Sequence, residues 1–202
     1  MMSTFSDLHL SISMNWLFPK ICIVCKVNSQ SILCPNCMPK YVTPVSQNSN
    51  ISYLYRYKGS IKEIIHKFKF EGEKSIGKFL IISLDPKYLQ QFDLIIPVPC
   101  HWLRLLQRRF NHLNYLFDFL PNFNAKLVKR EKYTGYFHKL NKQERELRIK
   151  NAFNVVQGER VTGKKILIVD DIITTGTTFN ELSNELCKYN PSSIHGLFLA
   201  KV

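Results

Sequence analysis

The chain has 202 residues, 45% of them hydrophobic, which suffices for one α/β domain and a small accessory module but hardly for two full domains. Its 28 Lys and Arg against 15 Asp and Glu give a formal charge of +13, which favours nucleic acids, phosphorylated metabolites or anionic membranes as partners. No uncharged apolar run reaches 18 residues and no secretory signal is evident, so we expect a cytoplasmic protein without a transmembrane segment. The stretch Leu8–Phe18, uncharged apart from His9, leaves peripheral membrane contact open, although a simple N-terminal lead-in explains it better.

Four of the six cysteines form two Cys-x-x-Cys pairs separated by eight residues: Cys22 with Cys25, and Cys34 with Cys37. Each pair can form a tight turn that supplies two thiolates, so the quartet predicts a tetrahedral structural zinc (Zn2+) site. The alternatives are disulfides or a redox motif, but a redox motif would normally show one pair next to a βαβ unit. Cys100 and Cys187 stand apart and are expected to be packed thiols.

A linker is predicted over Met38–Asn50, because this stretch contains two prolines and a Ser/Asn cluster but little periodicity. We therefore expect a zinc-ribbon segment over residues 1–45 and a second domain over residues 46–202. The ribbon is too short to bury a core, so bound metal would supply most of its folding free energy.

Strand and helix patterns alternate through the second domain. A strand is predicted over Ile51–Tyr57, followed by an amphipathic helix over Ser60–Phe70 with Ser60 as its N-cap. The remaining predicted elements are, in chain order, a helix between Gly72 and Ser83, a strand over Phe92–Val98, a helix over His101–Phe119, a strand over Asn124–Lys129, a charged helix or loop over Lys139–Lys150, a strand over Lys165–Asp170, a helix over Thr177–Tyr189 and a strand over Ile194–Ala200. This alternation predicts a mainly parallel sheet flanked by helices.

The most informative segment is Ile166–Thr178, where a buried strand ends in two carboxylates and a threonine-rich turn with one glycine opens a helix. In α/β sheets such turns lie at the carboxyl edge, where ligands bind. Backbone N–H groups at the helix start and threonine hydroxyls can surround a phosphate, while carboxylates can accept from sugar hydroxyls. The segment is not a Walker loop, because no Gly-Lys-Ser/Thr is present. The alternative is a capped strand-to-helix turn with incidental acids.

This segment resembles the 5-phosphoribosyl-1-pyrophosphate (PRPP) signature of type I phosphoribosyltransferases: four apolar residues, two acids, two apolar residues and Thr-Thr-Gly-x-Thr. The resemblance implies a type I phosphoribosyltransferase-like α/β fold in which Asp170 and Asp171 bind the ribose hydroxyls as catalytic residues. It implies that magnesium (Mg2+) binds together with PRPP. It also implies a loop that holds the 5-phosphate, formed by Thr174, Thr175, Gly176, Thr177 and Thr178.

With the cysteine quartet in front of this loop, the chain from residue 22 to residue 200 resembles the competence protein ComF family and its GntX-like relatives. The further matching segments are Tyr55-Arg-Tyr57, Lys67-Phe-Lys69-Phe70, Asp93–Pro99 and, after it, Arg104, Arg108, Phe110 and Asn111. The resemblance implies a protein of natural transformation (DNA uptake) that binds PRPP and handles or processes incoming single-stranded DNA, with a competence helicase or channel protein as a partner. Two alternatives stay open: an Mg2+-dependent phosphoribosyltransferase acting on a small-molecule or nucleobase acceptor, and a PRPP-sensing regulator.

Basic residues are the candidates for contacts with nucleic acid or pyrophosphate, because arginine forks suit both. These candidates are Arg104, Arg108, Arg109, Lys67 and Lys69. A solvated basic helix face explains the arginines equally well. The segment 126–150 carries nine Lys and Arg against three Glu, which predicts a mobile loop that binds single-stranded DNA. The histidines show no ligand spacing and are expected to be structural or surface residues.

Overall fold

A computed structural model describes residues 21–22, 24–29, 33–37, 50–72, 75–82, 84–102, 105–106, 110–132 and 142–202. The chain divides into two compact units, residues 1–40 and 41–202. The stretch Leu8–Phe18 and nearly all of the expected linker Met38–Asn50 lie outside the described residues. Within the described part of the chain, no helix is long and apolar enough to cross a membrane.

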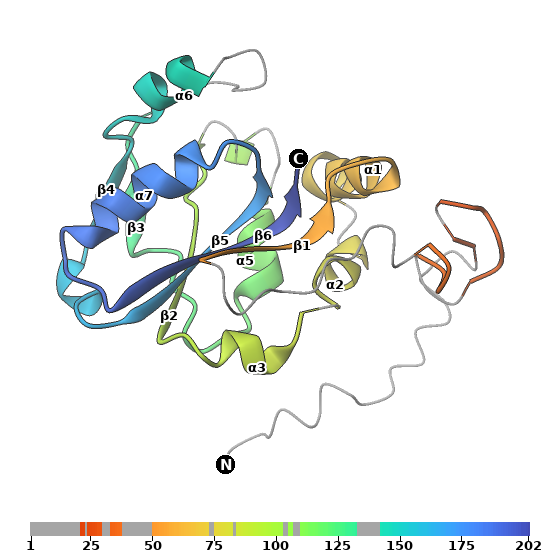
Figure 1. Cartoon of the computed structure of the whole chain (residues 1–202), viewed down its shortest axis with the longest axis horizontal. Coiled ribbons are helices and arrows are strands. Elements are labelled where there is room, and N and C mark those ends of the chain that lie inside the picture. The colour runs from red at the N-terminus through yellow and green to blue at the C-terminus, as the bar shows by residue number, and fades with distance from the viewer. Residues whose placement is uncertain are drawn as a thin grey trace. The chain divides into compact units, whose positions relative to one another are not determined.

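The second unit is built on a four-stranded sheet in which all neighbouring strands are parallel (Figure 1). In spatial order its strands are β1 (Ile51–Arg56), β6 (Ser193–Lys201), β5 (Lys165–Ile173) and β2 (Leu94–Pro97). Residues Ile166–Val169 of β5 are fully buried, as expected for a central parallel strand whose two faces are both covered. The predicted parallel α/β sheet is therefore confirmed. The pairing of β2 with β5 ends at Val169, so the carboxyl end of β5 extends beyond β2 and is paired with β6 alone.

Helices cover both faces of this sheet, and a second, two-stranded antiparallel sheet packs beside it. The helical elements of the described residues are α1 (Ser60–His66), the π-helix η3 (Lys67–Glu71), α2 (Ser75–Ile81), α3 (Pro86–Leu89), α5 (His112–Phe117), α6 (Lys142–Ile149), the 3-10 helix η4 (Gly158–Arg160) and α7 (Thr177–Cys187). The two-stranded sheet consists of β3 (Val128–Arg130) and β4 (Phe153–Val155). Buried residues of α7, β2, β5, β6 and the two-stranded sheet form one continuous hydrophobic core.

The chain between β1 and β2 packs its aromatic residues on the face of the sheet that α5 covers. Tyr55 of β1 stacks on Phe79 of α2 with ring centroids 5.9 Å apart, and its hydroxyl donates to the Phe79 carbonyl at 3.0 Å. Phe68 of η3 is fully buried and contacts the rings of His112 and Tyr115 on α5. Because these contacts hold η3 against α5, residues far apart in sequence meet on the side of β5 that faces α5.

Two predictions about helix boundaries are wrong. Ser60 is the first helical residue and not the N-cap, because Gly59, with a φ of 50°, occupies the cap position and forms no side-chain cap. The single helix predicted over His101–Phe119 does not form, because Asn111 is extended and its side chain caps a new helix at His112. That cap accepts from the backbone N–H groups of Leu113 and Asn114 at 3.1 and 3.2 Å.

The predictions for the segment after α5 are partly right. Instead of one strand over Asn124–Lys129, Phe123 forms an isolated parallel bridge with Ile95 and β3 begins only at Val128. Of the two alternatives for Lys139–Lys150, the helix is present over Lys142–Ile149, while residues 133–141 lie outside the described chain.

Candidate functional site

The four predicted cysteine ligands come together in the first unit. The Sγ atoms of Cys22, Cys25, Cys34 and Cys37 all lie within 4.8 Å of one another, and those of Cys25 and Cys34 are 3.6 Å apart. A tetrahedral zinc with Zn–S bonds of about 2.3 Å separates its sulfur ligands by roughly 3.8 Å. The four thiols therefore fit a structural zinc ion.

Backbone hydrogen bonds shape the turn that carries the first pair. The Cys22 N–H donates to the Val27 carbonyl at 2.7 Å, and the Lys26 N–H donates to the Cys22 carbonyl at 2.9 Å. Lys26 has a left-handed φ of 62°, which turns the chain back after Cys25. The Cys34 N–H points at the Cys22 sulfur at 3.4 Å and so links the two pairs.

Without a bound cation, the pKa values of Cys22 and Cys37 are shifted in opposite directions. Burial acts to raise the pKa of Cys22, but backbone N–H groups around its sulfur lower that pKa to about 6. Burial and the neighbouring cysteine sulfurs raise the pKa of Cys37 to about 12. Four thiolates can coexist here only if a cation offsets their mutual repulsion, which is what a bound zinc ion supplies.

We expect one zinc ion per chain in freshly reduced protein, and we expect the variant Cys34→Ser to lose it, because three thiolates hold zinc much less well than four. Elemental analysis by mass spectrometry after gel filtration measures the stoichiometry. The matched control is Cys187→Ser, which should keep the metal; this thiol of the second unit is exposed, so the expectation that it would be packed is wrong. Wild-type protein without zinc, or full zinc retention by Cys34→Ser, contradicts the assignment.

A pocket opens in the second unit where β5 ends and α7 begins. It is lined by Asp170, Ile172, Ile173, Thr174, Thr175, Gly176, Thr177, Thr178, Phe179 and Phe198. Gly176 is the N-cap of α7 and has a left-handed φ of 77°, a conformation that glycine adopts without strain. No side chain caps the first turn of α7, so its backbone N–H groups and positive dipole end face the pocket.

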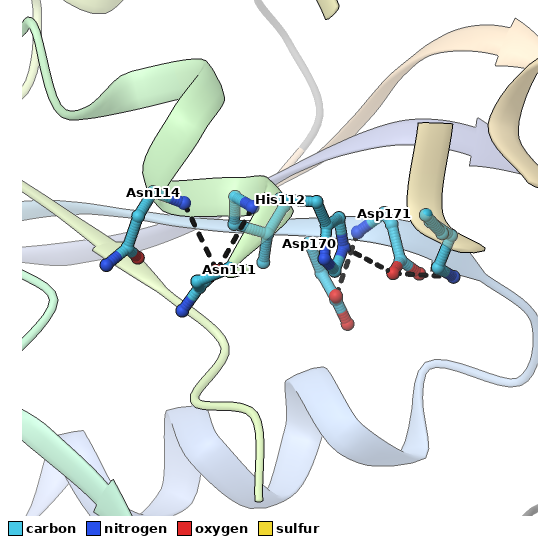
Figure 2. Close-up of polar contacts among 7 residues, drawn as sticks. Asn111, His112, Asn114, Asp170 and Asp171 are labelled. Atoms are coloured by element: carbon cyan, nitrogen blue, oxygen red, sulfur yellow. Dashed lines mark hydrogen bonds and ion pairs between the residues drawn. The ribbon is translucent and has the colours of Figure 1, made fainter. Parts of the chain in front are cut away.

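The two carboxylates at the end of β5 lie in different surroundings (Figure 2). Asp170 lines the pocket, and its Oδ1 accepts from the backbone N–H of Asp171 at 2.8 Å. The Oδ2 of Asp171 lies 2.6 Å from Lys69 Nζ and 2.8 Å from His112 Nε2. One carboxylate therefore faces the pocket, while the other belongs to a largely buried cluster of charged side chains.

The same surroundings shift the pKa values of the pair in opposite directions. Burial and the charge of Asp171 raise the pKa of Asp170 to about 7, although the Asp171 N–H, Lys69 and Arg130 act to lower it. Burial also acts to raise the pKa of Asp171, but Lys69 and His112 hold it well below its ordinary value. Asp171 is thus ionised at neutral pH, whereas Asp170 is close to its titration midpoint.

The structure brings some of the predicted site residues together. The acidic pair and the loop residues Thr174–Thr178 adjoin one another, and Lys69 contacts the pair. Lys67 is half-buried at the start of η3, and among the described residues no hydrogen bond or ion pair ties it to the pocket. The three candidate arginines, Arg104, Arg108 and Arg109, lie outside the described residues.

Sequence reasoning missed His112, which was expected to be an ordinary structural or surface histidine. It lies 59 positions before Asp171, so no spacing rule connects the two residues. The available signal was Asn111: an N-cap residue there starts a helix with His112 in its first turn. The positions of Arg130 and Tyr57 near the acidic pair were likewise not anticipated.

The raised pKa of Asp170 makes a prediction about stability. An unfolded aspartate ionises near pH 4, while the folded Asp170 resists ionisation until about pH 7, so this residue destabilises the fold increasingly as pH rises through that window. We expect Asp170→Asn to raise Tm only slightly at pH 4.5 and by about 3–6 °C at pH 8, which corresponds to roughly 1–2 kcal/mol for a partly exposed group.

Thermal unfolding followed by circular dichroism across pH 4.5–8 measures this difference. The control variant Glu159→Gln removes an exposed carboxylate of η4 and should shift Tm equally little at both pH values. A pH-independent effect of Asp170→Asn contradicts the assigned pKa.

The parallel sheet, the strand-to-helix pocket and its acidic pair define an α/β protein of the phosphoribosyltransferase type. The sequence matches the family model described as "Phosphoribosyl transferase domain" over residues 133–201. It is 33% identical over 153 residues to "Competence protein F" of Haemophilus influenzae, covering 68% of this chain and 66% of that protein. It is 28% identical over 151 residues to "DNA utilization protein YhgH" of Shigella flexneri, with 68% of this chain and 66% of that protein covered.

The chain therefore belongs to the ComF/YhgH family, whose phosphoribosyltransferase domain it combines with an N-terminal four-cysteine cluster. It spans about two thirds of the length of the two relatives named above. Among solved structures, the "structure of the allosteric regulatory enzyme of purine biosynthesis" matches with a TM-score of 0.37 and 21% identity. That match covers 62% of this chain and 25% of the other.

Proposed function

We propose that this protein binds PRPP in the pocket between β5 and α7 and handles incoming single-stranded DNA during natural transformation. The observation that carries the proposal is the pocket itself, in which a carboxylate and an uncapped, threonine-rich helix start face the same space. A sugar phosphate presents hydroxyl donors and a phosphate in one molecule, and these two features of the pocket match its two ends. The relatives named for competence and DNA utilization support the transformation role.

In this proposal the loop Thr174–Thr178 holds the 5-phosphate, and the acidic pair Asp170–Asp171 recognises the ribose. The hydroxyls of Thr175 and Thr177 lie 2.7 Å apart and can rotate from each other toward phosphate oxygens. The Asp170 carboxylate lines the pocket and can also approach a hydrated Mg2+ carried by the ligand. Bound Mg2+ would offset the charge of the pyrophosphate group.

We expect wild-type protein to bind PRPP in the presence of Mg2+, and we expect Asp170→Ala/Asp171→Ala to weaken this binding by about 100-fold or more. The reason is that the variant removes Asp170, whose carboxylate lines the pocket and can accept two charge-assisted hydrogen bonds worth about 1.5–3 kcal/mol each, together with Asp171, whose N–H holds that carboxylate. Isothermal titration calorimetry gives the affinity, and circular dichroism shows whether the variant is folded. Asp118→Ala, which removes an exposed carboxylate, is the control. If the double variant is folded and binds PRPP as tightly as the wild-type protein, the assignment of the PRPP site to the acidic pair is wrong.

The DNA part of the proposal is supported by the net charge of +13, since a basic protein attracts nucleic-acid phosphates. If about four phosphates are neutralised, affinity for a 20-nucleotide oligo(dT) should fall roughly 50-fold between 50 and 200 mM salt. Fluorescence polarisation of labelled oligonucleotide measures this slope. Adding saturating oligonucleotide to the PRPP titration then tests linkage, because a changed PRPP affinity means that the two sites are thermodynamically coupled. A salt-insensitive affinity contradicts backbone-driven binding.

A second candidate is an Mg2+-dependent phosphoribosyltransferase that transfers ribose phosphate to a nitrogen nucleophile, and the family-model match to a phosphoribosyltransferase domain favours it. Release of inorganic pyrophosphate from PRPP distinguishes it from a binding protein. Sustained release with a nucleobase or oligonucleotide acceptor supports catalysis. PRPP binding without release in any such mixture supports a handling protein or a PRPP-sensing regulator.

A further inference from the structure

The two adjacent carboxylates project from opposite faces of β5. Side chains alternate along a strand, so residues 170 and 171 cannot face the same way. Asp170 is among the residues that line the pocket near α7, together with Ile172 two positions later, whereas Asp171 is not. Figure 2 shows β5 between α7, on the side of Asp170, and α5, from which His112 reaches Asp171.

Lys69 reaches Asp171 because of a local irregularity in its helix. The chain leaves α1 and continues as the π-helix η3, which buries both Phe68 and Lys69, two adjacent residues. A π-helical turn changes the direction of side chains relative to a regular α-helix and is found most often at functional sites. The Lys69 side chain is only 10% exposed and places Nζ 2.6 Å from Asp171 Oδ2. A buried lysine of this kind needs its ionic partner, because an unpaired buried charge is costly.

His112 approaches the same oxygen from the first turn of α5. The Asn111 cap sets where that helix begins, and the Phe68 ring and the imidazole pack in a T-shaped arrangement with centroids 6.1 Å apart. The His112 side chain is 3% exposed, and its Nε2–H donates to Asp171 Oδ2 at 2.8 Å. Two separate segments of the chain, η3 and α5, therefore converge on one carboxylate oxygen of β5.

We propose that Asp171 anchors the acidic pair, that Lys69 and His112 are positioning residues acting through it, and that Asp170 is the carboxylate that faces the bound sugar phosphate. This inference rests on the proposed PRPP function and assigns different roles to the two acids. Asp171 holds the end of β5 in place. The hydrogen bond from its N–H to Asp170 Oδ1 then holds the Asp170 carboxylate in position at the pocket. Lys69 and His112 need not contact the ligand to affect its binding.

The charged groups around the pair provide a readout that structural damage alone would not produce. Asp170 is influenced by Asp171, which raises its pKa, and by Lys69 and Arg130, which lower it. Tyr57 lies close enough to Asp171 for the aspartate charge to raise the tyrosine pKa, in addition to the effect of burial. Removing the Lys69 charge should therefore move the titration of Asp170 to higher pH, and removing the Asp171 charge should move it to lower pH.

The test is a double-mutant cycle on the full-length protein with PRPP and Mg2+ as the ligand. Affinity is measured by calorimetry from pH 5.5 to pH 8.5 for wild type, Lys69→Met, Asp171→Asn and the combined variant, with Asp170→Asn for comparison. We expect about a 10-fold or greater loss for Lys69→Met, with its pH profile displaced upward, and a smaller loss for Asp171→Asn, with its profile displaced downward. The combined variant should bind better than Lys69→Met, because it no longer leaves the Asp171 charge unpaired.

His112→Gln keeps a donor of similar length and should lose less affinity than His112→Ala. Lys188→Met is the matched control, since Lys188 pairs with Glu185 at the exposed end of α7 and its loss should not alter PRPP affinity. If Asp171→Asn costs as much as Asp170→Asn at every pH, or if the losses for Lys69→Met and Asp171→Asn simply add without opposite pH displacements, the division of roles is wrong. Wild-type protein that does not bind PRPP would instead refute the proposed function, and this inference would fail with it.

Discussion

The contact on which the candidate site depends is the buried junction of Asp171 with Lys69 and His112. It joins the end of β5 to η3 and to α5, two elements that hydrophobic contacts around Phe68 also hold together. An ion pair of this kind adds little net stability, because the cost of desolvation offsets most of the attraction between the charges. Its main effect is on geometry: it fixes the direction in which the acidic pair leaves the sheet.

The sheet could be predicted from the sequence because its strands carry their signal locally. The fully apolar run of Ile166–Val169 and the helix pattern after Thr177 indicate a strand and a crossover without any knowledge of neighbours. Elements set by non-local contacts were predicted less well. Residues 101–119 carry apolar residues at helical spacing, yet the side chain of Asn111 caps a new helix in the middle of this stretch. Strand β3 covers only the three residues that pair with β4, which lies 25 positions later in the sequence.

The site was predicted in the same uneven way. The cysteine quartet and the loop from Asp170 to Thr178 are contiguous or closely spaced, so their residue types alone indicate their chemistry. Lys69 was a candidate for a different reason, as a basic residue that could contact phosphate or DNA, and its contact with Asp171 depends on the π-helical turn, which no propensity rule predicts. His112 was missed because its role depends on a contact that folding creates between distant segments.

The proposed PRPP site raises an electrostatic problem, because it places two carboxylates near a polyphosphate and carboxylates repel phosphates. In this protein the charge of Asp171 is offset by Lys69, and the raised pKa of Asp170 leaves that residue only partly ionised near neutral pH. The uncapped start of α7 adds positive potential on the pocket side of β5. Asp170 can therefore offer acceptors to sugar hydroxyls without surrounding the pocket with negative charge, because Lys69 and His112 already engage the Asp171 carboxylate.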